Sequence, residues 1–159
     1  MESSAERRID PSVLSYIEAA QPVQELLQQV LTQVAGYSLM LMTGGKPAAR
    51  PDGSLLLARQ AAGRAHDDLL ALPVPALAAH HHHHLSRAAE STQWAFAAAD
   101  ACAAADASDG ERDTLSRALW SATGHLRATA RLLPGFEMVD FGQACCAAHA
   151  HAATAATPR

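Results

Sequence analysis

The chain has few aromatic residues and few charged ones. Aromatic residues make up 4% of its 159 positions and charged residues 18%, against about 25% charged in an average soluble domain. The β-branched and aromatic residues that fill sheets are too scattered to give sustained alternation with a period of two. These shortages exclude a core built of β-sheet and predict an all-α protein.

Long apolar runs are also missing. No stretch approaches the roughly 18 apolar residues that a membrane span needs, and the charged segment 2–10 lacks the apolar core of a signal peptide. The three cysteines, Cys102 and the adjacent Cys145 and Cys146, cannot form an ordinary secreted disulfide framework. A protein of the reducing cytoplasm, without a membrane partner, is therefore expected.

Basic charge is scarce and dispersed. The formal net charge is −4, and Lys46 is the only lysine. Non-specific nucleic-acid binding needs a concentrated basic field, and so does attraction to an anionic membrane surface. This charge balance predicts that neither is a partner.

Alanine is abundant, and it favours helices whose axes can approach closely. Apolar residues recur at steps of three and four, the pattern of amphipathic helices. Because the connections between helices are short, neighbouring helices should be antiparallel. We expect one domain over 1–159, an all-α antiparallel up-down four-helix bundle with a short C-terminal fifth helix or tail. The predicted helices cover 11–42, 54–72, 76–107 and 109–133, with a linker at 43–53 and frayed ends at 1–9 and 154–159.

Local signals mark the ends and interruptions of these helices. Asp10 followed by Pro11 suits a helix start, and Ser108 with Glu111 matches a capping box. Pro22 predicts a kink or break at 19–21, because proline removes one helical hydrogen bond. The fifth segment, from Phe136 to about residue 153, is compatible with a helix that packs across one end of the bundle.

Five consecutive histidines, residues 80–84, form the most unusual feature of the chain. His66 lies about as far before the 73–75 turn as His82 lies after it, so an antiparallel pair places them level. Leu133 should also stand level with the run. The C-terminal tail that follows it, which carries Cys145, Cys146 and His149, should therefore start near the run. By the same count His125 lies about 13 Å away along the bundle, which makes it a poor partner for the run. The inward stripe of the third helix is predicted as Leu77, His81, His84, Ala88, Ser91, Ala95, Ala98 and Cys102.

Imidazole and thiolate groups suit Zn²⁺, Ni²⁺ and Cu ions. A transition-metal site at this end of the bundle is therefore one hypothesis, with ligands drawn from the histidine run, from His66 and from the C-terminal tail. The spacing of Cys145 and Cys146 from His149 suits one helical face. In a competing interpretation, the histidine run is a solvated tract that binds metal only adventitiously. Cys145 and Cys146 are then structural thiols and not metal ligands. The candidate ligands are His66, His80, His81, His84, Cys145 and His149.

Sequence motifs of catalysis are missing, including G-x-S-x-G, the Walker loop, G-x-G-x-x-G and H-E-x-x-H. We therefore expect a non-enzymatic bundle that acts through protein–protein contact. The expected contact is self-association into a homodimer. Trp94, Phe96 and residues 97–99 are predicted to leave apolar surface beyond the needs of one helical seam. A metal-binding bundle is the alternative function, and an apolar pocket for a small ligand is a third possibility.

Overall fold

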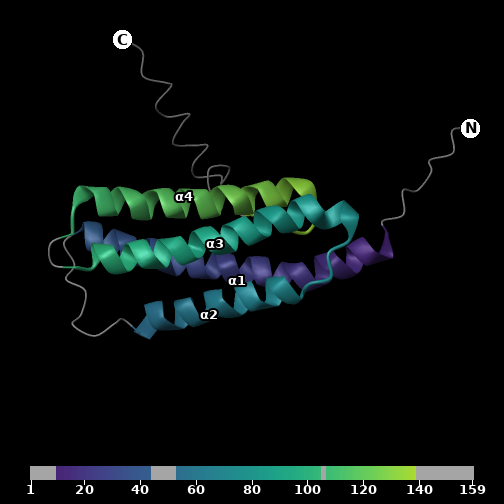
Figure 1. Ribbon diagram of the computed structural model, residues 1–159, viewed down its shortest axis with the longest axis horizontal. Helices are drawn as coiled ribbons and strands as arrows, with labels where there is room; N and C mark the ends of the chain where they lie inside the picture. Colours follow the sequence, from purple (N-terminus) through teal and green to yellow (C-terminus); the bar gives the residue numbers. More distant parts are fainter. Residues whose placement is uncertain (1–9, 44–52, 105–106, 139–159) are drawn as a thin grey trace, which may run out of the picture.

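A computed structural model describes residues 10–43, 53–104 and 107–138, and within them the protein is helical without strands. Successive helices run in opposite directions, which confirms the all-α, up-down prediction (Figure 1). The helices are α1 (Pro11–Met42), α2 (Gly53–Ala71), α3 (Ala79–Cys102) and α4 (Asp109–Leu132), with a 3₁₀ turn, η1 (Ala76–Ala78), ahead of α3.

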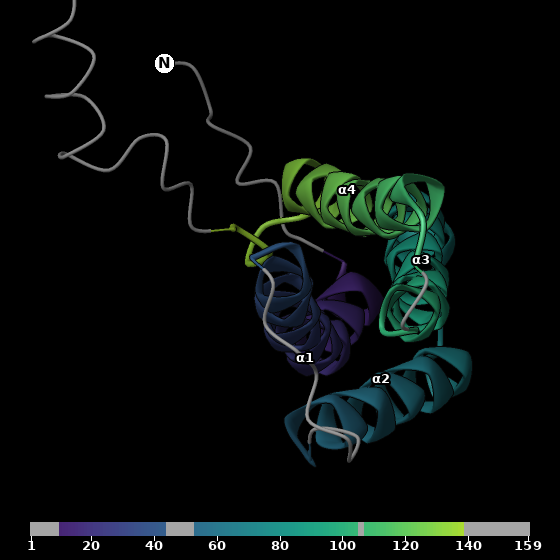
Figure 2. The same ribbon diagram turned by 90° about the vertical axis from the view of Figure 1, so that its left-hand side faces the viewer.

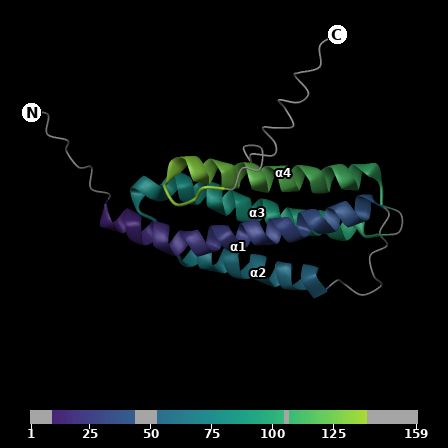
Figure 3. The same ribbon diagram turned by 180° about the vertical axis from the view of Figure 1, so that it is seen from behind.

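Helix α3 is the central element of the bundle. It packs against α1, α2 and α4, and its contact with α4 is the most extensive between any two helices. Seen end-on, α3 lies between α4 on one side and α2 on the other (Figure 2). From behind, α1 crosses in front of this row (Figure 3). Apolar side chains on several sides of α3 are therefore used inside the bundle.

Neighbouring residues explain where helix α1 begins and why it continues through a proline. Asp10 caps its first turn by accepting a hydrogen bond from the Ser12 N–H, and Pro11 occupies the first turn. The expected break at 19–21 does not occur, since the helix runs through Pro22 to Met42. Pro22 and Glu18 are exposed, so water can reach the carbonyl group that proline leaves without a helical partner.

The ends of α3 and α4 partly match the prediction. The 3₁₀ turn η1 precedes α3, and α3 ends at Cys102, earlier than the expected 107. The capping box before α4 is confirmed: the Glu111 N–H donates to the Ser108 hydroxyl, and the Ser108 N–H donates to the Glu111 carboxylate. Leu77 is exposed, so its predicted inward position is wrong.

The buried residues divide into two clusters along the bundle. We call the one near the start of α1 the histidine half, because His81 is buried beside it. Its members are Val13, Tyr16, Ile17, Ala20, Val23, Leu27, Leu31, Ala65, Leu69, Ala78, Leu85, Ala88, Ala89, Ala122, Leu126 and Phe136. We call the other the alanine half, and its members are Val30, Val34, Tyr37, Leu55, Ala58, Ala61, Ala62, Ala95, Phe96, Ala98, Ala99, Cys102, Leu115 and Ala118.

The segment after α4 folds back onto α1. Gly135 has a φ of 86°, which favours glycine, and a Cβ at this position would collide with the Gln21 amide. The Gln24 amide donates to the Phe136 carbonyl at 2.8 Å, and the Phe136 ring is buried. Phe136–Met138 are not helical, so the predicted start of a fifth helix at Phe136 is wrong. Residues 139–153 of that prediction lie outside the described residues.

Candidate functional site

The histidine run forms the first turns of α3, and the helix distributes its five side chains around the axis. His81 is buried, His82 and His84 are half-buried, and His80 and His83 are exposed. The run is therefore not a uniform solvated tract. Three of its members, His81, His82 and His84, make contacts with residues far away in the sequence.

His81 belongs to the core of the histidine half. Its Nδ1 is hydrogen-bonded to the Tyr16 hydroxyl at 2.9 Å, and its ring packs on Phe136 with 4.1 Å between centroids. Burial, followed by the neighbouring His82 and His84, lowers the pKa of His81 to about 4. Burial also raises the pKa of Tyr16. His81 is therefore neutral at pH 7, and it connects α3 to α1.

His84 pairs with His125 of α4, with 2.9 Å between their Nδ1 atoms. The expected separation of about 13 Å was wrong, because the height of α4 had been taken from Leu133. The connection between α3 and α4 determines the register instead, and both histidines lie at nearly equal distances from it along the chain. The Ser91 and Ser121 hydroxyls, 2.9 Å apart, lie on the same seam. His125, which the sequence ranks as a poor partner for the run, is thus paired with one of its members.

Further imidazoles surround this pair. The His80 ring lies 4.9 Å from the His84 ring, and the His83 ring 5.7 Å from it, measured between centroids. Burial lowers the pKa of both paired histidines, with His80 and His83 contributing at His84, and His84 and Arg87 contributing at His125. The pair is therefore uncharged at pH 7, with one Nδ1–H donating to the other Nδ1.

Of the other predicted ligands that the structure describes, His66 is not brought to this pair. His66 is on α2, and α2 packs against α1 and α3 but not against α4. Cys145, Cys146 and His149 lie outside the described residues. Within residues 10–43, 53–104 and 107–138, no group of three or more His, Cys, Asp or Glu side chains is placed to hold a metal ion.

Apolar side chains on the outside of the bundle form a second candidate site. Both tryptophans are exposed, Trp94 by 54% and Trp120 by 71%. Phe96, Ala98 and Ala99 are buried, so the prediction that they leave surface free was wrong. The physical reason is that α3 contacts three other helices.

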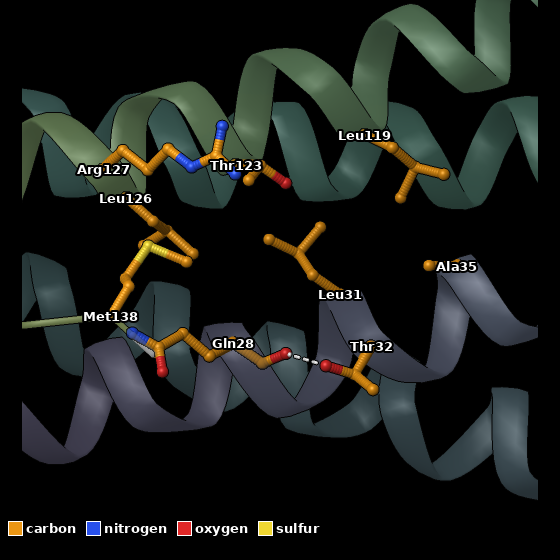
Figure 4. Close-up of a pocket in the computed structure, with 9 residues that line it drawn as sticks. All are labelled: Gln28, Leu31, Thr32, Ala35, Leu119, Thr123, Leu126, Arg127 and Met138. Atoms are coloured by element: carbon orange, nitrogen blue, oxygen red, sulfur yellow. Dashed lines mark hydrogen bonds between the residues drawn. The ribbon is translucent and has the colours of Figure 1, made fainter. Parts of the chain in front are cut away.

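A pocket of about 440 Å³ lies between α1 and α4 (Figure 4). Met138, from the segment after α4, lies at one end of it, and the Arg127 side chain extends along one edge. The lining is mixed apolar and polar, with Gln28, Leu31, Thr32, Ala35, Leu119, Thr123 and Leu126 as its other members. The small-ligand possibility thus has a physical location, away from the histidine pair.

Comparisons with protein-family models, curated proteins and solved structures find no match to this chain. Among the helices described, none combines the length and the apolar character required to cross a membrane. Any function assigned to the bundle therefore rests on its own side chains.

Proposed function

We propose that this bundle is a non-enzymatic protein that acts through contact with other protein chains, and that its first partner is a second copy of itself. The observation that carries the proposal is a stripe on α2 defined by two exposed leucines, Leu56 and Leu70, with the half-buried Gly63 midway between them. Leu56 is 51% exposed and Leu70 is 75% exposed. The three residues are seven apart, nearly two helical turns, so they share one face.

The stripe is symmetric about its glycine. In a two-fold antiparallel pair of α2 helices centred on Gly63, Leu56 of one copy lies opposite Leu70 of the other, and the reverse contact follows by symmetry. Nothing lies within 4 Å of a Cβ built on Gly63, so a partner backbone can approach closely there. The two leucine contacts remove from water the most exposed apolar groups of this face.

The exposed tryptophans support the same function more generally. Tryptophan is enriched at the centres of protein interfaces, because its large ring buries much apolar area. The Arg87 guanidinium lies 5.5 Å from the centre of the Trp94 ring, covering part of it. Cys102 carries a free, buried thiol, which fits the proposed cytoplasmic setting.

Sedimentation velocity of Leu70→Glu tests the proposal. The wild-type protein is expected to dimerise at micromolar concentration, and L70E to raise the dissociation constant about tenfold or more by placing a charge in the apolar contact. Leu57→Glu is the matched control, because Leu57 is on the same helix and 65% exposed but lies on a different face from the stripe. A strictly monomeric wild-type protein, or equal effects of the two variants, would overturn the proposal.

A further inference from the structure

Two imidazoles from different helices direct their Nδ1 atoms at each other. His84 of α3 and His125 of α4 are 2.9 Å apart at these atoms. Two nitrogen ligands about 2.0–2.1 Å from a metal lie about 3 Å apart when the angle at the metal is near 90°, and about 3.3–3.4 Å apart at the tetrahedral angle that Zn²⁺ prefers. A metal ion bound by both nitrogens therefore requires little change in their spacing.

A third imidazole is within reach. His80 is four residues before His84, the spacing that places two side chains on one helical face, and their ring centroids are 4.9 Å apart. His80 is exposed, so its side chain can change rotamer without disturbing the core. In the described conformation the three are not yet placed around one point, and a rotation of His80 is what completes the set.

The surroundings favour a soft or borderline cation. The nearby Glu90 carboxylate is engaged in an ion pair with the Arg87 guanidinium, so the donor atoms of the site are imidazole nitrogens. Neutral imidazoles suit Zn²⁺, Ni²⁺ and Cu²⁺, whereas Mg²⁺ and Ca²⁺ prefer oxygen ligands. One Nδ1 of the pair carries the shared hydrogen, so coordination through both Nδ1 atoms requires that ring to carry its proton on Nε2 instead.

The geometry points to a transition-metal site on the seam between α3 and α4, with His84 and His125 as its paired ligands and His80 as its third. This ligand set differs from the sequence-based one. It includes His125, and it needs neither His66 nor the cysteines of the tail. His81 packs against Tyr16 of α1 and Phe136, so it supports the start of α3 without joining the site.

Calorimetric titration of untagged, chelator-treated protein with Zn²⁺ tests this inference. One ion per chain is expected, with an affinity that falls about tenfold or more in His84→Gln and in His125→Gln. His83→Gln and His66→Gln are matched controls, one within the run and one on α2, and both should keep the wild-type affinity. Thermal unfolding of each variant without metal checks that the fold is intact.

Nitrogen-15 NMR of the imidazoles gives a second measurement in the wild-type chain. Zn²⁺ should shift the Nδ1 resonances of His84 and His125 and leave that of His66 in place. Absence of Zn²⁺ binding would overturn the inference. It would also be overturned if H125Q bound Zn²⁺ as tightly as the wild type while every substitution within residues 80–84 weakened binding equally, since that is the behaviour of a solvated tract.

Discussion

The two halves of the bundle are held together by different means. In the histidine half, buried polar groups connect distant segments: Tyr16 with His81, and Gln24 with both Thr129 and the Phe136 carbonyl. In the alanine half, Phe96 shares an apolar cluster with many small side chains, and the Arg59 guanidinium lies over its ring. The comparison predicts that the histidine half responds to pH and to the loss of single polar atoms, whereas the alanine half responds to changes in volume.

The largest effect is expected from Phe96→Ala in the alanine half. Phe96 is fully buried, and more than half of the other buried members of its cluster are small alanine or cysteine side chains, which are too short to fill the space that the ring leaves. The substitution should lower the free energy of unfolding by about 3–5 kcal/mol, measured by urea denaturation. Leu85→Ala in the histidine half, also fully buried, should cost less because its neighbours are larger and can relax into the space. Equal losses would contradict the proposed difference in packing.

A pH titration of stability tests the histidine half. The pKa of His81 is about 4 in the folded protein, against an ordinary value of 6.5. As pH falls, the unfolded chain takes up the proton first, so the stabilising contribution is complete above pH 6.5 and is lost between pH 6.5 and pH 4. Between pH 7 and pH 5 this loss is about 2 kcal/mol. Urea denaturation in the presence of a chelator measures it.

Matched variants assign that pH dependence to one half of the molecule. His81→Phe should make the stability profile between pH 7 and pH 5 shallower by the His81 contribution, leaving the dependence that comes from His82, His84 and His125, whose pKa values are also lowered. Its stability at pH 7 is lower because the Tyr16 hydroxyl loses its partner. Phe96→Leu should lower the whole profile without changing its slope. An unchanged slope in H81F would show that the buried imidazole is not the responsible group.

Local signals predicted the helices well because each depends on neighbouring residues. The Asp10 cap, the capping box at Ser108 and the start of α4 follow from backbone groups that must be satisfied within one turn. Periodicity also identified most of the buried stripes. Leu77 was misplaced because the chain is still in the 3₁₀ turn there, where the helical period of α3 has not begun.

The site was less predictable because it depends on the relative height of two helices. Counting from the 73–75 turn places α2 against α3, but α4 is positioned by the connection at its own start, so the His84–His125 pair was missed. Counting back from that connection could have found it. Phe136 was assigned to a helix on composition alone, whereas long-range hydrogen bonds from Gln21 and Gln24 to backbone carbonyls position this segment.

The smallest effect is expected from Gln24→Ala in the histidine half. Gln24 is buried, and its amide donates to the Phe136 carbonyl while its oxygen accepts from the Thr129 hydroxyl. In this variant the Thr129 hydroxyl keeps the Leu126 carbonyl as acceptor. The Phe136 carbonyl, by contrast, loses the amide that donates its hydrogen bond. The loss should be roughly 1–2 kcal/mol, measured by urea denaturation. Gln21→Ala is the control, since its bond to the Gly135 carbonyl is exposed and water can replace it. Equal losses would mean that burial does not distinguish the two bonds, and that the histidine half is not held by its buried polar groups.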